Sequence, residues 1–472
     1  MRRGRRWFLL LAVAVAGCGR VATERPPAAA PRYLVGAHYY VWFPDNFRHG
    51  MLRTRLDPPQ SPALGFYRSD TPDAATEHIA WCSQYGVDFL TLDWWPGRTQ
   101  QNAAITTGFL EAPNIADIRF CIFYETWGLG FNKDYGCTEF TPERCDRFVA
   151  EMLELTERFF DHPSYLHVQG RPVVVLYLSR TFTGDFEGAI MSYRRAARAR
   201  GYDPYLVGDE VFWQVSPLVE EGQIPFPLVS EPQPERMACL DAITAYNMYE
   251  NNHLSQRGYG RDSTFTTDVA AQFDRFRCAL PPGRAFVPSV IPGYNDRGVR
   301  PSVEHHAIPR QWAPGGAEGS FLAESFERLA FPFVDPELNM ILVTSFNEWN
   351  EDTAIEPLRE AEATTKDISR QPGFYTEGYA YAGHGTRYLE VIRDKVVAVA
   401  GQVGDATGAG LPARSVTVIQ GRRRRTVQTD SRGYYRVPRG HILPGPCRVR
   451  LRATGAVKEG IVGVDRTLLI DF

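Results

Sequence analysis

Eight short apolar runs, each separated from the next by a longer segment, constrain the fold of this chain more than any other feature. One intervening segment reads as a helix, with Thr71 at the N-cap, Pro72 at the first helical position and Gly86 at the end. Strands that alternate with helices predict βαβ units and a parallel sheet. The runs are Tyr33–Tyr40, Val87–Trp95, Ile118–Glu125, Pro172–Leu178, Tyr205–Glu210, Ala242–Asn247, Ala285–Ile291 and Met340–Phe346.

Eight such units predict an α/β fold over residues 32–395, a (β/α)8 TIM-like barrel with insertions. A doubly wound open sheet is the alternative, but no glycine-rich phosphate loop follows the first run. In a barrel of this kind the functional side chains lie at the C-terminal ends of the strands. We therefore expect the residues that end each run to meet at one rim.

Carboxylates, amides and aromatic rings predominate at these run ends. This mixture suits a neutral polyhydroxylated ligand, because carboxylates and amides bind hydroxyl groups while rings stack on apolar sugar faces. Plainer interpretations exist: Asp93 can cap the next helix, and Asp296 can pair with Arg297 for structural reasons. The predicted substrate-binding residues are Tyr39, Tyr40, Asp93, Trp94, Trp95, Glu125, Tyr177, Tyr246, Asn247, Tyr294, Asp296, Arg297, Asn347 and Trp349.

Two carboxylates, Glu348 and Glu351, follow the last run three residues apart. In one interpretation they begin a helix, whose first turn favours acidic side chains. In the other they are a catalytic pair, because i,i+3 spacing on a helical turn places Cβ atoms roughly 5–6 Å apart and repulsion then raises one pKa. Glycosidic bond cleavage needs such a protonated acid beside an ionised partner. We predict the catalytic pair, since a helix start accounts for only one of the two.

The stretch around this pair resembles a known family. TSFNEWNEDTAIEP at Thr344–Pro357 resembles the most specific motif of glycoside hydrolase family 99, the endo-α-1,2-mannosidases, and of their WbsX-like relatives in polysaccharide gene clusters. GFYRSD at Gly65–Asp70 and PGYNDR at Pro292–Arg297 resemble further motifs of that family. The resemblance covers residues 33–392 in order.

This resemblance implies a (β/α)8 endo-acting, retaining glycosidase that needs no cofactor. It implies that Glu348 acts as base on the substrate's own 2-hydroxyl, which attacks the anomeric carbon and forms a 1,2-anhydro sugar. It also implies that Glu351 protonates the leaving oxygen and then activates the incoming water, with Glu125 near the sugar. Asn350 and Asp352 depart from the family, where His and Gly are usual.

The partner implied is a polysaccharide or oligosaccharide with α-mannoside-like or related linkages. Two other classes stay open: a non-catalytic carbohydrate-binding or structural lipoprotein, and a WbsX-like protein of polysaccharide biosynthesis. Retention of both Glu348 and Glu351 favours the enzyme, because a binding module needs no paired acid and base. A net charge of −3 gives no reason to expect nucleic acid, and the cysteines show no metal-binding spacing. The sequence carries no signal for an oligomeric state.

The N-terminus predicts export. Four arginines precede an apolar core at residues 7–16, which is typical of a signal peptide. Val15–Cys18 resembles a bacterial lipobox, so we expect a lipoprotein leader at 1–18 with lipidation of Cys18; an ordinary secretory signal is the alternative. Residues 19–31, rich in proline and alanine, predict a flexible linker. The protein is then expected on the periplasmic or cell-surface face of a membrane, which it contacts through its lipid.

The C-terminal residues 396–472 predict a separate domain. Short β-like runs broken by Gly, Pro and Asp indicate a small all-β sandwich. GQV at Gly401–Val403 and TDSRGYY at Thr429–Tyr435 resemble the carboxypeptidase regulatory-like domain, a transthyretin-like and non-catalytic fold. The run Arg422–Arg425 is expected in a solvated hairpin, with contact to anionic polysaccharide or lipid headgroups as the alternative.

Overall fold

The computed structural model describes residues 32–48, 50–132, 136–211, 231–250 and 257–472. The predicted leader (1–18), linker (19–31) and lipidation site Cys18 lie outside the described residues. Among the described residues, no helix is both long and apolar enough to span a bilayer.

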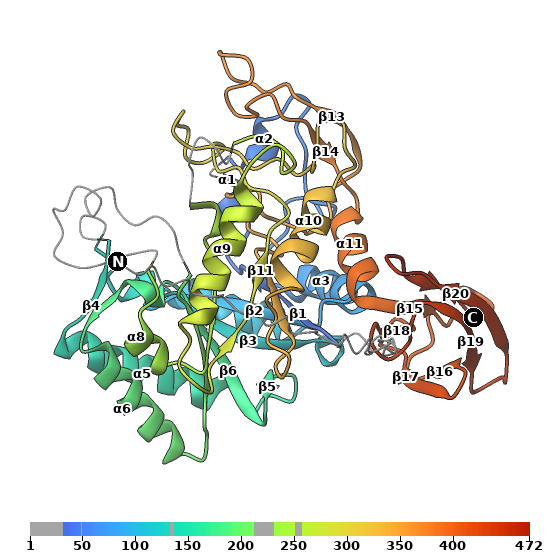
Figure 1. The fold of residues 1–472 in the computed structure, drawn as a ribbon, viewed down its shortest axis with the longest axis horizontal. Helices are drawn as coiled ribbons and strands as arrows, with labels where there is room; N and C mark the ends of the chain where they lie inside the picture. The colour runs from blue at the N-terminus through green and yellow to red at the C-terminus, as the bar shows by residue number, and fades with distance from the viewer. Residues whose placement is uncertain (1–31, 49, 133–135, 212–230, 251–256) are drawn as a thin grey trace, which may run out of the picture.

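A parallel sheet at the centre of the larger domain confirms the predicted (β/α)8 barrel (Figure 1). Its strands pair in the order β10-β9-β8-β6-β3-β2-β1-β12-β11, and the two ends of this order belong to one segment, 285–290. Val287 donates to the Ile243 carbonyl at 2.8 Å, and Leu342 donates to the Pro288 carbonyl at 3.0 Å. This segment therefore pairs on both sides and closes the barrel. The strands are β1 (Leu34–Tyr39), β2 (Phe89–Trp94), β3 (Arg119–Tyr124), β6 (Arg171–Leu176), β8 (Tyr205–Asp209), β9 (Ala242–Thr244), β10 (Ala285–Phe286), β11 (Ser289–Val290) and β12 (Met340–Val343).

Each predicted run contains a barrel strand because continuous apolar runs suit strands buried on both faces. All six residues of β2 are buried, and so are five of the six in β1. The seventh run forms two short strands instead of one. Pro288 lies between them and lacks the backbone N–H that a continuous ladder needs.

Helices cover the outside of the barrel (Figure 1). The predicted start and end of α3 (Pro72–Tyr85) are confirmed: Pro72 is its first residue, and Gly86 has φ +99° and donates to the Cys82 carbonyl. In α5 (Pro142–Phe159), the Thr141 side chain accepts from the Arg144 N–H as an N-cap. The other helices are α1 (Asp45–Arg48), α2 (Leu52–Arg55), α4 (Thr99–Ala104), α6 (Phe186–Arg198), α8 (Pro234–Ala238), α9 (Phe265–Cys278), α10 (Ser320–Ser325) and α11 (Arg387–Val396).

The C-terminal part consists of two small β-sheets around their own apolar core. One sheet has the order β18-β15-β21 and the other β17-β16-β19-β20. Sequence reasoning missed β20 and β21, because β20 is largely exposed and carries charged residues. The strands are β15 (Val397–Gln402), β16 (Ser415–Gln420), β17 (Arg423–Gln428), β18 (Tyr434–Pro438), β19 (Gly445–Leu451), β20 (Val457–Val462) and β21 (Leu468–Leu469).

This sandwich packs against the side of the barrel where the strands begin. Asp88, directly before β2, forms an ion pair with Arg436 at 2.9 Å. Ser83 of α3 donates to Asp430 at 2.7 Å. Helix α11 ends at Val396 and β15 follows without a linker. The sandwich therefore lies away from the rim at which the strands end.

Candidate active site

Glu348 and Glu351 lie beyond the C-terminal end of β12, in a turn rather than a helix. The interpretation as a helix start is therefore wrong, because residues 349–352 form a turn and an irregular segment follows. Two hydrogen bonds fix the turn. The Glu348 N–H donates to Ser345 Oγ at 2.7 Å, and the Asn295 N–H donates to the Glu351 carbonyl at 2.8 Å.

Asp352 completes the turn with φ +49°, a left-handed conformation that glycine adopts most easily. Glycine, which the family resemblance leads us to expect here, would adopt this conformation without strain. Here the Asp352 carboxylate is buried between two arginines: Arg53 Nε lies 2.6 Å from Oδ1, and Arg310 Nε lies 3.0 Å from Oδ2. These contacts with Arg53 and Arg310 hold the turn on the side away from the carboxylate pair.

The Glu348 carboxylate is buried, and within the described ranges it accepts one hydrogen bond, from the Asn350 N–H to Oε1 at 2.8 Å. Burial raises the pKa of Glu348 well above its usual range, and the negative charge of Glu351 raises it further. Arg300 acts in the opposite direction. Glu348 therefore tends to hold a proton in the free protein.

Glu351 has a different environment. The Tyr249 hydroxyl donates to its Oε2 at 2.5 Å, and Arg300 Nη1 lies 3.4 Å from its Oε1. Burial raises the pKa of Glu351, but Arg300 and Tyr249 both favour its ionised form. The Tyr249 ring stacks on Tyr294 with centroids 4.1 Å apart, which places Tyr294 beside the pair as predicted. Two adjacent carboxylates in unequal environments can share one proton, as acid–base chemistry needs.

A second pair of buried carboxylates, Asp93 and Glu125, lies at the ends of β2 and β3. The Trp95 indole N–H donates to Asp93 Oδ2 at 2.7 Å, while Asp93 Oδ1 has no partner among the described residues. The Trp127 N–H donates to Glu125 Oε1 at 3.2 Å. Burial raises the pKa of both carboxyls, and the charge of Asp93 raises the pKa of Glu125 further. Protonated, this pair can donate hydrogen bonds to sugar hydroxyls.

Tyrosine hydroxyls line the space between these carboxylates. Tyr40 and Tyr246 hydrogen-bond to each other, and Asn247 Nδ2 donates to the Tyr177 hydroxyl at 3.2 Å. Burial raises the pKa of both Tyr246 and Tyr177; the charge of Glu351 adds to this for Tyr246, and the charges of Glu125 and then Glu351 add to it for Tyr177. Asn247 Oδ1 has no partner among the described residues and can accept from a ligand. The structure thus brings these four predicted residues together with Glu351.

Two predicted ligand residues face away from the barrel interior. Side chains alternate along a strand, so Tyr40 points inward and its neighbour Tyr39 outward. The Tyr39 hydroxyl bonds to His78 Nδ1 of α3 at 2.9 Å. Trp94 stacks on Tyr124, in the layer between the barrel and α5. The predicted contact of Tyr39 and Trp94 with substrate is therefore wrong, while Trp95, beyond the strand end, remains at the rim.

Three further predictions are corrected by hydrogen bonding within the protein. Asn347 is fully buried and bridges to the Tyr40 backbone, accepting its N–H at 2.7 Å and donating to its carbonyl at 3.0 Å. Trp349 is fully buried and donates to Glu356 Oε2 at 2.9 Å. Arg297 donates to the carbonyls of His305, Val303 and Phe374 and to Glu377. These three side chains support the site and do not line it.

Sequence reasoning missed Tyr249 and Arg300, which contact Glu351 directly. Asp296 binds Arg300 at 3.0 Å and so acts through it, while its Oδ1 has no partner among the described residues. One signal was readable: Arg300 follows Asp296 by four residues, in a loop that the family motif already marks. Tyr249 gave no signal beyond its closeness in sequence to Tyr246.

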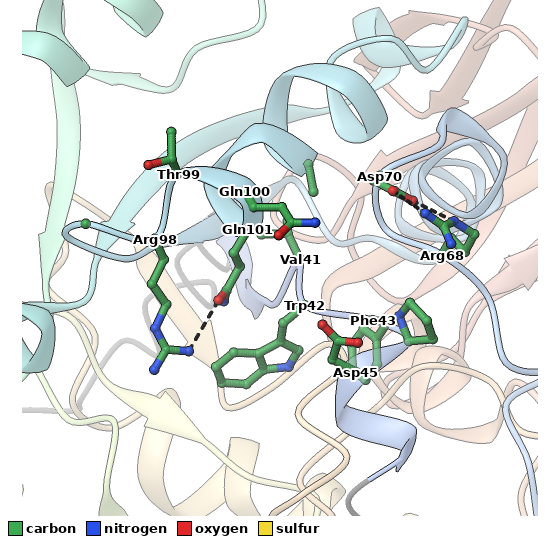
Figure 2. A pocket seen from close by; sticks show the side chains of 13 residues that line it. Val41, Trp42, Phe43, Asp45, Arg68, Asp70, Arg98, Thr99, Gln100 and Gln101 are labelled. Carbon is green, nitrogen blue, oxygen red and sulfur yellow. Dashed lines mark hydrogen bonds and ion pairs between the residues drawn. The ribbon is translucent and has the colours of Figure 1, made fainter.

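A pocket of about 1000 Å³ lies beside the rim (Figure 2). Trp42 lines it and stacks on Tyr40 with centroids 4.5 Å apart, and Trp95 lies 6.2 Å from Trp42. The Arg98 guanidinium lies 4.1 Å from the centre of the Trp95 ring and also lines the pocket. Aromatic rings such as Trp42 and Trp95 suit stacking on the apolar faces of sugar units.

The described residues include no group of three or more His, Cys, Asp or Glu side chains arranged to hold a metal ion. Seven cysteines are described and all are free thiols.

Comparison with known proteins confirms the resemblance seen in the sequence. A model of the family described as "Glycosyltransferase WbsX" matches residues 54–365, which include Glu348 and Glu351. A glycoprotein endo-alpha-1,2-mannosidase-like protein of Mus musculus is 24% identical over 333 residues, covering 64% of this chain and 60% of the relative. A glycoprotein endo-alpha-1,2-mannosidase of Rattus norvegicus is 22% identical over 389 residues, covering 75% of this chain and 74% of the relative.

A solved structure described as "Glycoside hydrolase-like protein" has a TM-score of 0.55 and 18% identity, and covers 79% of this chain and 97% of that chain. This likeness supports the fold. The chain spans less than two thirds of the mouse relative. The family match ends at residue 365, before β15, so the identification of the sandwich as a carboxypeptidase regulatory-like domain stays a prediction.

Proposed function

We propose that this chain, which belongs to the family described as "Glycosyltransferase WbsX" and is similar to proteins named glycoprotein endo-alpha-1,2-mannosidase, is an endo-acting, retaining glycosidase. Its substrate is a glycan with α-mannoside-like or related linkages. The observation that carries this proposal is the pair of carboxylates, Glu348 and Glu351, on one rigid turn at the rim, with unequal hydrogen-bond partners.

The proposed reaction has two steps. In the first, the Glu348 carboxylate takes the proton of the sugar's 2-hydroxyl, whose oxygen attacks the anomeric carbon. The bond to the leaving oxygen breaks, and that oxygen takes a proton from Glu351. In the second, water opens the resulting 1,2-anhydro sugar at the anomeric carbon, Glu351 takes the water proton, and Glu348 returns its proton to O2. Two displacements at the same carbon retain its configuration.

In the free protein the proton is on the other carboxyl from the one that the first step requires. Burial favours neutral Glu348, whereas Arg300 favours ionised Glu351. The pair needs only one proton, and it must move from Glu348 to Glu351 before the first step. The Arg300 side chain is 52% exposed, so a bound glycan can displace it from Glu351 and raise the pKa of that carboxyl. Substrate binding thus supports the protonation state that the reaction requires.

A role in polysaccharide biosynthesis is the second candidate, favoured by the printed description of the family. The charges at the rim argue against a sugar nucleotide as donor. Glu351 is ionised in the free protein and repels a diphosphate, and Arg300, which contacts Glu351, is already paired with Asp296. A neutral glycan meets no such repulsion.

We further propose that the protein is exported and held on a membrane through lipidated Cys18.

Product analysis tests the proposed activity. Residues 32–472 are incubated with α-mannans and bacterial surface polysaccharides, beside the E348Q and E351Q variants and E362Q as an exposed control on β13 (Ala361–Thr364). The parent and E362Q are expected to release oligosaccharides from at least one glycan, and the two other variants are not. Glycan binding that all four share, with no product from any, would instead establish a binding protein.

An activated substrate separates the roles of the two carboxylates. A glycosyl fluoride needs no protonation of its leaving group, so E351Q is expected to recover the first step on it. E348Q is expected to stay inactive, because the 2-hydroxyl still needs a base. The opposite result would exchange the two roles while leaving the glycosidase proposal intact.

A further inference from the structure

Seven arginines gather on one sheet of the sandwich and none is used by the proposed chemistry. The cross-strand pairs Ile419–Arg424, Ile419–Arg448 and Thr417–Arg450 place three of them on the outer face of the β17-β16-β19-β20 sheet. All are exposed, and none forms an ion pair with the described part of the chain. Arg424, Arg448 and Arg450 are called here the arginine face. The same register places Arg423 and Arg425 opposite Gln420 and Val418, on the other face of the sheet, and Arg422 and Arg452 lie just beyond the strand ends.

Charge is divided sharply between the two parts of the chain. Residues 397–472 contain 13 Arg and Lys against 5 Asp and Glu, whereas residues 32–396 contain 33 against 49. The sandwich is therefore strongly basic on an acidic protein. This distribution of charge favours attachment of the basic sandwich to an anionic surface, because such a surface attracts the sandwich and repels the acidic barrel.

Apolar side chains accompany the arginines on the same face. Ile461 is 73% exposed and Val457 51% exposed, and the β19–β20 register places them opposite Pro446 and Arg450. A hollow of about 480 Å³ is lined by Arg448 and Ile461 and by Glu459, the one acidic residue of β20, which lies opposite Arg448. Basic and apolar groups on one face suit a lipid surface, where phosphates meet the guanidinium groups and apolar side chains reach the interface.

The described structure begins beside the sandwich. The Val35 N–H, at the start of β1, donates to Asp88 Oδ2 at 2.9 Å, and Asp88 forms the ion pair with Arg436 of β18. Only 13 residues separate a lipidated Cys18 from Arg32, so such an anchor holds the start of β1, with the sandwich beside it, within about 45 Å of the bilayer.

We propose that the arginine face docks on the anionic lipid headgroups of the membrane that anchors the protein. The sandwich packs where the barrel strands begin, so docking turns the rim with Glu348 and Glu351 away from the bilayer. The active site then faces the glycans outside the membrane. This docking does not depend on which glycan the barrel cleaves.

Vesicle binding tests the proposal without the acyl anchor. Residues 32–472 are sedimented with vesicles of phosphatidylcholine alone or with 30% phosphatidylglycerol, at about 0.1 M and 0.5 M salt. The triple variant R424Q/R448Q/R450Q is compared with R195Q/R261Q/R370Q, which removes three exposed arginines of the barrel domain. Each basic residue near an anionic surface strengthens binding about fivefold, so the first variant is expected to bind about 100-fold more weakly.

The control variant is expected to bind like the parent, and high salt is expected to weaken parental binding. Equal binding of the parent and R424Q/R448Q/R450Q would overturn the proposal, as would a parent that does not distinguish the two vesicle compositions. Retention of the parent on an anionic polysaccharide, without a preference for phosphatidylglycerol, would also overturn it and assign the face to glycan. Far-UV circular dichroism checks that both variants are folded.

Discussion

Arg300 sets the pH range in which the carboxylate pair can work. Its Nη1 lies 3.4 Å from Glu351 Oε1, and its side chain is 52% exposed. Coulomb's law gives about 1.2 kcal/mol for unit charges at this distance in water, and solvent exposure justifies this lower limit. We therefore expect R300Q to raise the pKa of Glu351 by about one pH unit.

The sign follows from the charges. Arg300 favours the ionised forms of both Glu348 and Glu351, so its removal raises both pKa values. Both limbs of the pH profile of kcat/KM, which report the free enzyme, are expected to move to higher pH. Carboxyl 13C NMR of labelled Glu gives the same shift without a substrate. R328Q, which removes an arginine of similar exposure from another part of the barrel domain, serves as the control.

A folded R300Q protein whose profile and carboxyl titrations match the parent would refute this reasoning. It would mean that solvent screens Arg300 completely. The unequal environments of the two carboxylates would then come from burial and Tyr249 alone.

D352A leaves two buried arginines without their counter-charge, so we expect it to lower the free energy of unfolding by about 3–5 kcal/mol in urea titration, with an unchanged midpoint counting against the role given to Asp352. E77Q removes the ion pair between Glu77 and Arg432, and both of these side chains are more than one third exposed. We expect the free energy of unfolding to fall by less than about 1 kcal/mol, and a larger fall would mean that this pair is a main attachment of the sandwich. Burial lowers the pKa of His38 from 6.5 to about 3, so protonation favours the unfolded chain and stability falls as the pH falls from about 6.5 towards 3. H38Q is expected to flatten this dependence in thermal melts at pH 4–7, and parallel curves would contradict it.

The barrel could be predicted because its strands are buried on both faces, which requires continuous apolar runs such as Met340–Val343. The same pattern does not show which neighbour a side chain meets. Strand alternation alone would have separated Tyr39 from Tyr40, and applying it would have removed Tyr39 and Trp94 from the site.

Other parts of the site could not be read from local sequence. Glu348 and Glu351 could be found because they lie only three residues apart in the chain. Their partners Tyr249 and Arg300 come from other loops, and which loops meet depends on the closed barrel. Asn347 was predicted to bind substrate because an amide at a strand end can bind either a ligand or the protein backbone. Only the position of the Tyr40 backbone, which the sequence does not show, distinguishes the two roles.

The contact between Arg53 and Asp352 has a consequence for how the enzyme matures. The two residues are 299 positions apart, and Arg310 adds a third segment to the same carboxylate. No partly folded intermediate that lacks either end of the barrel can hold the catalytic turn in its working conformation. The proposed activity therefore depends on this long-range pairing, and we expect the chain to be inactive until its whole barrel has assembled.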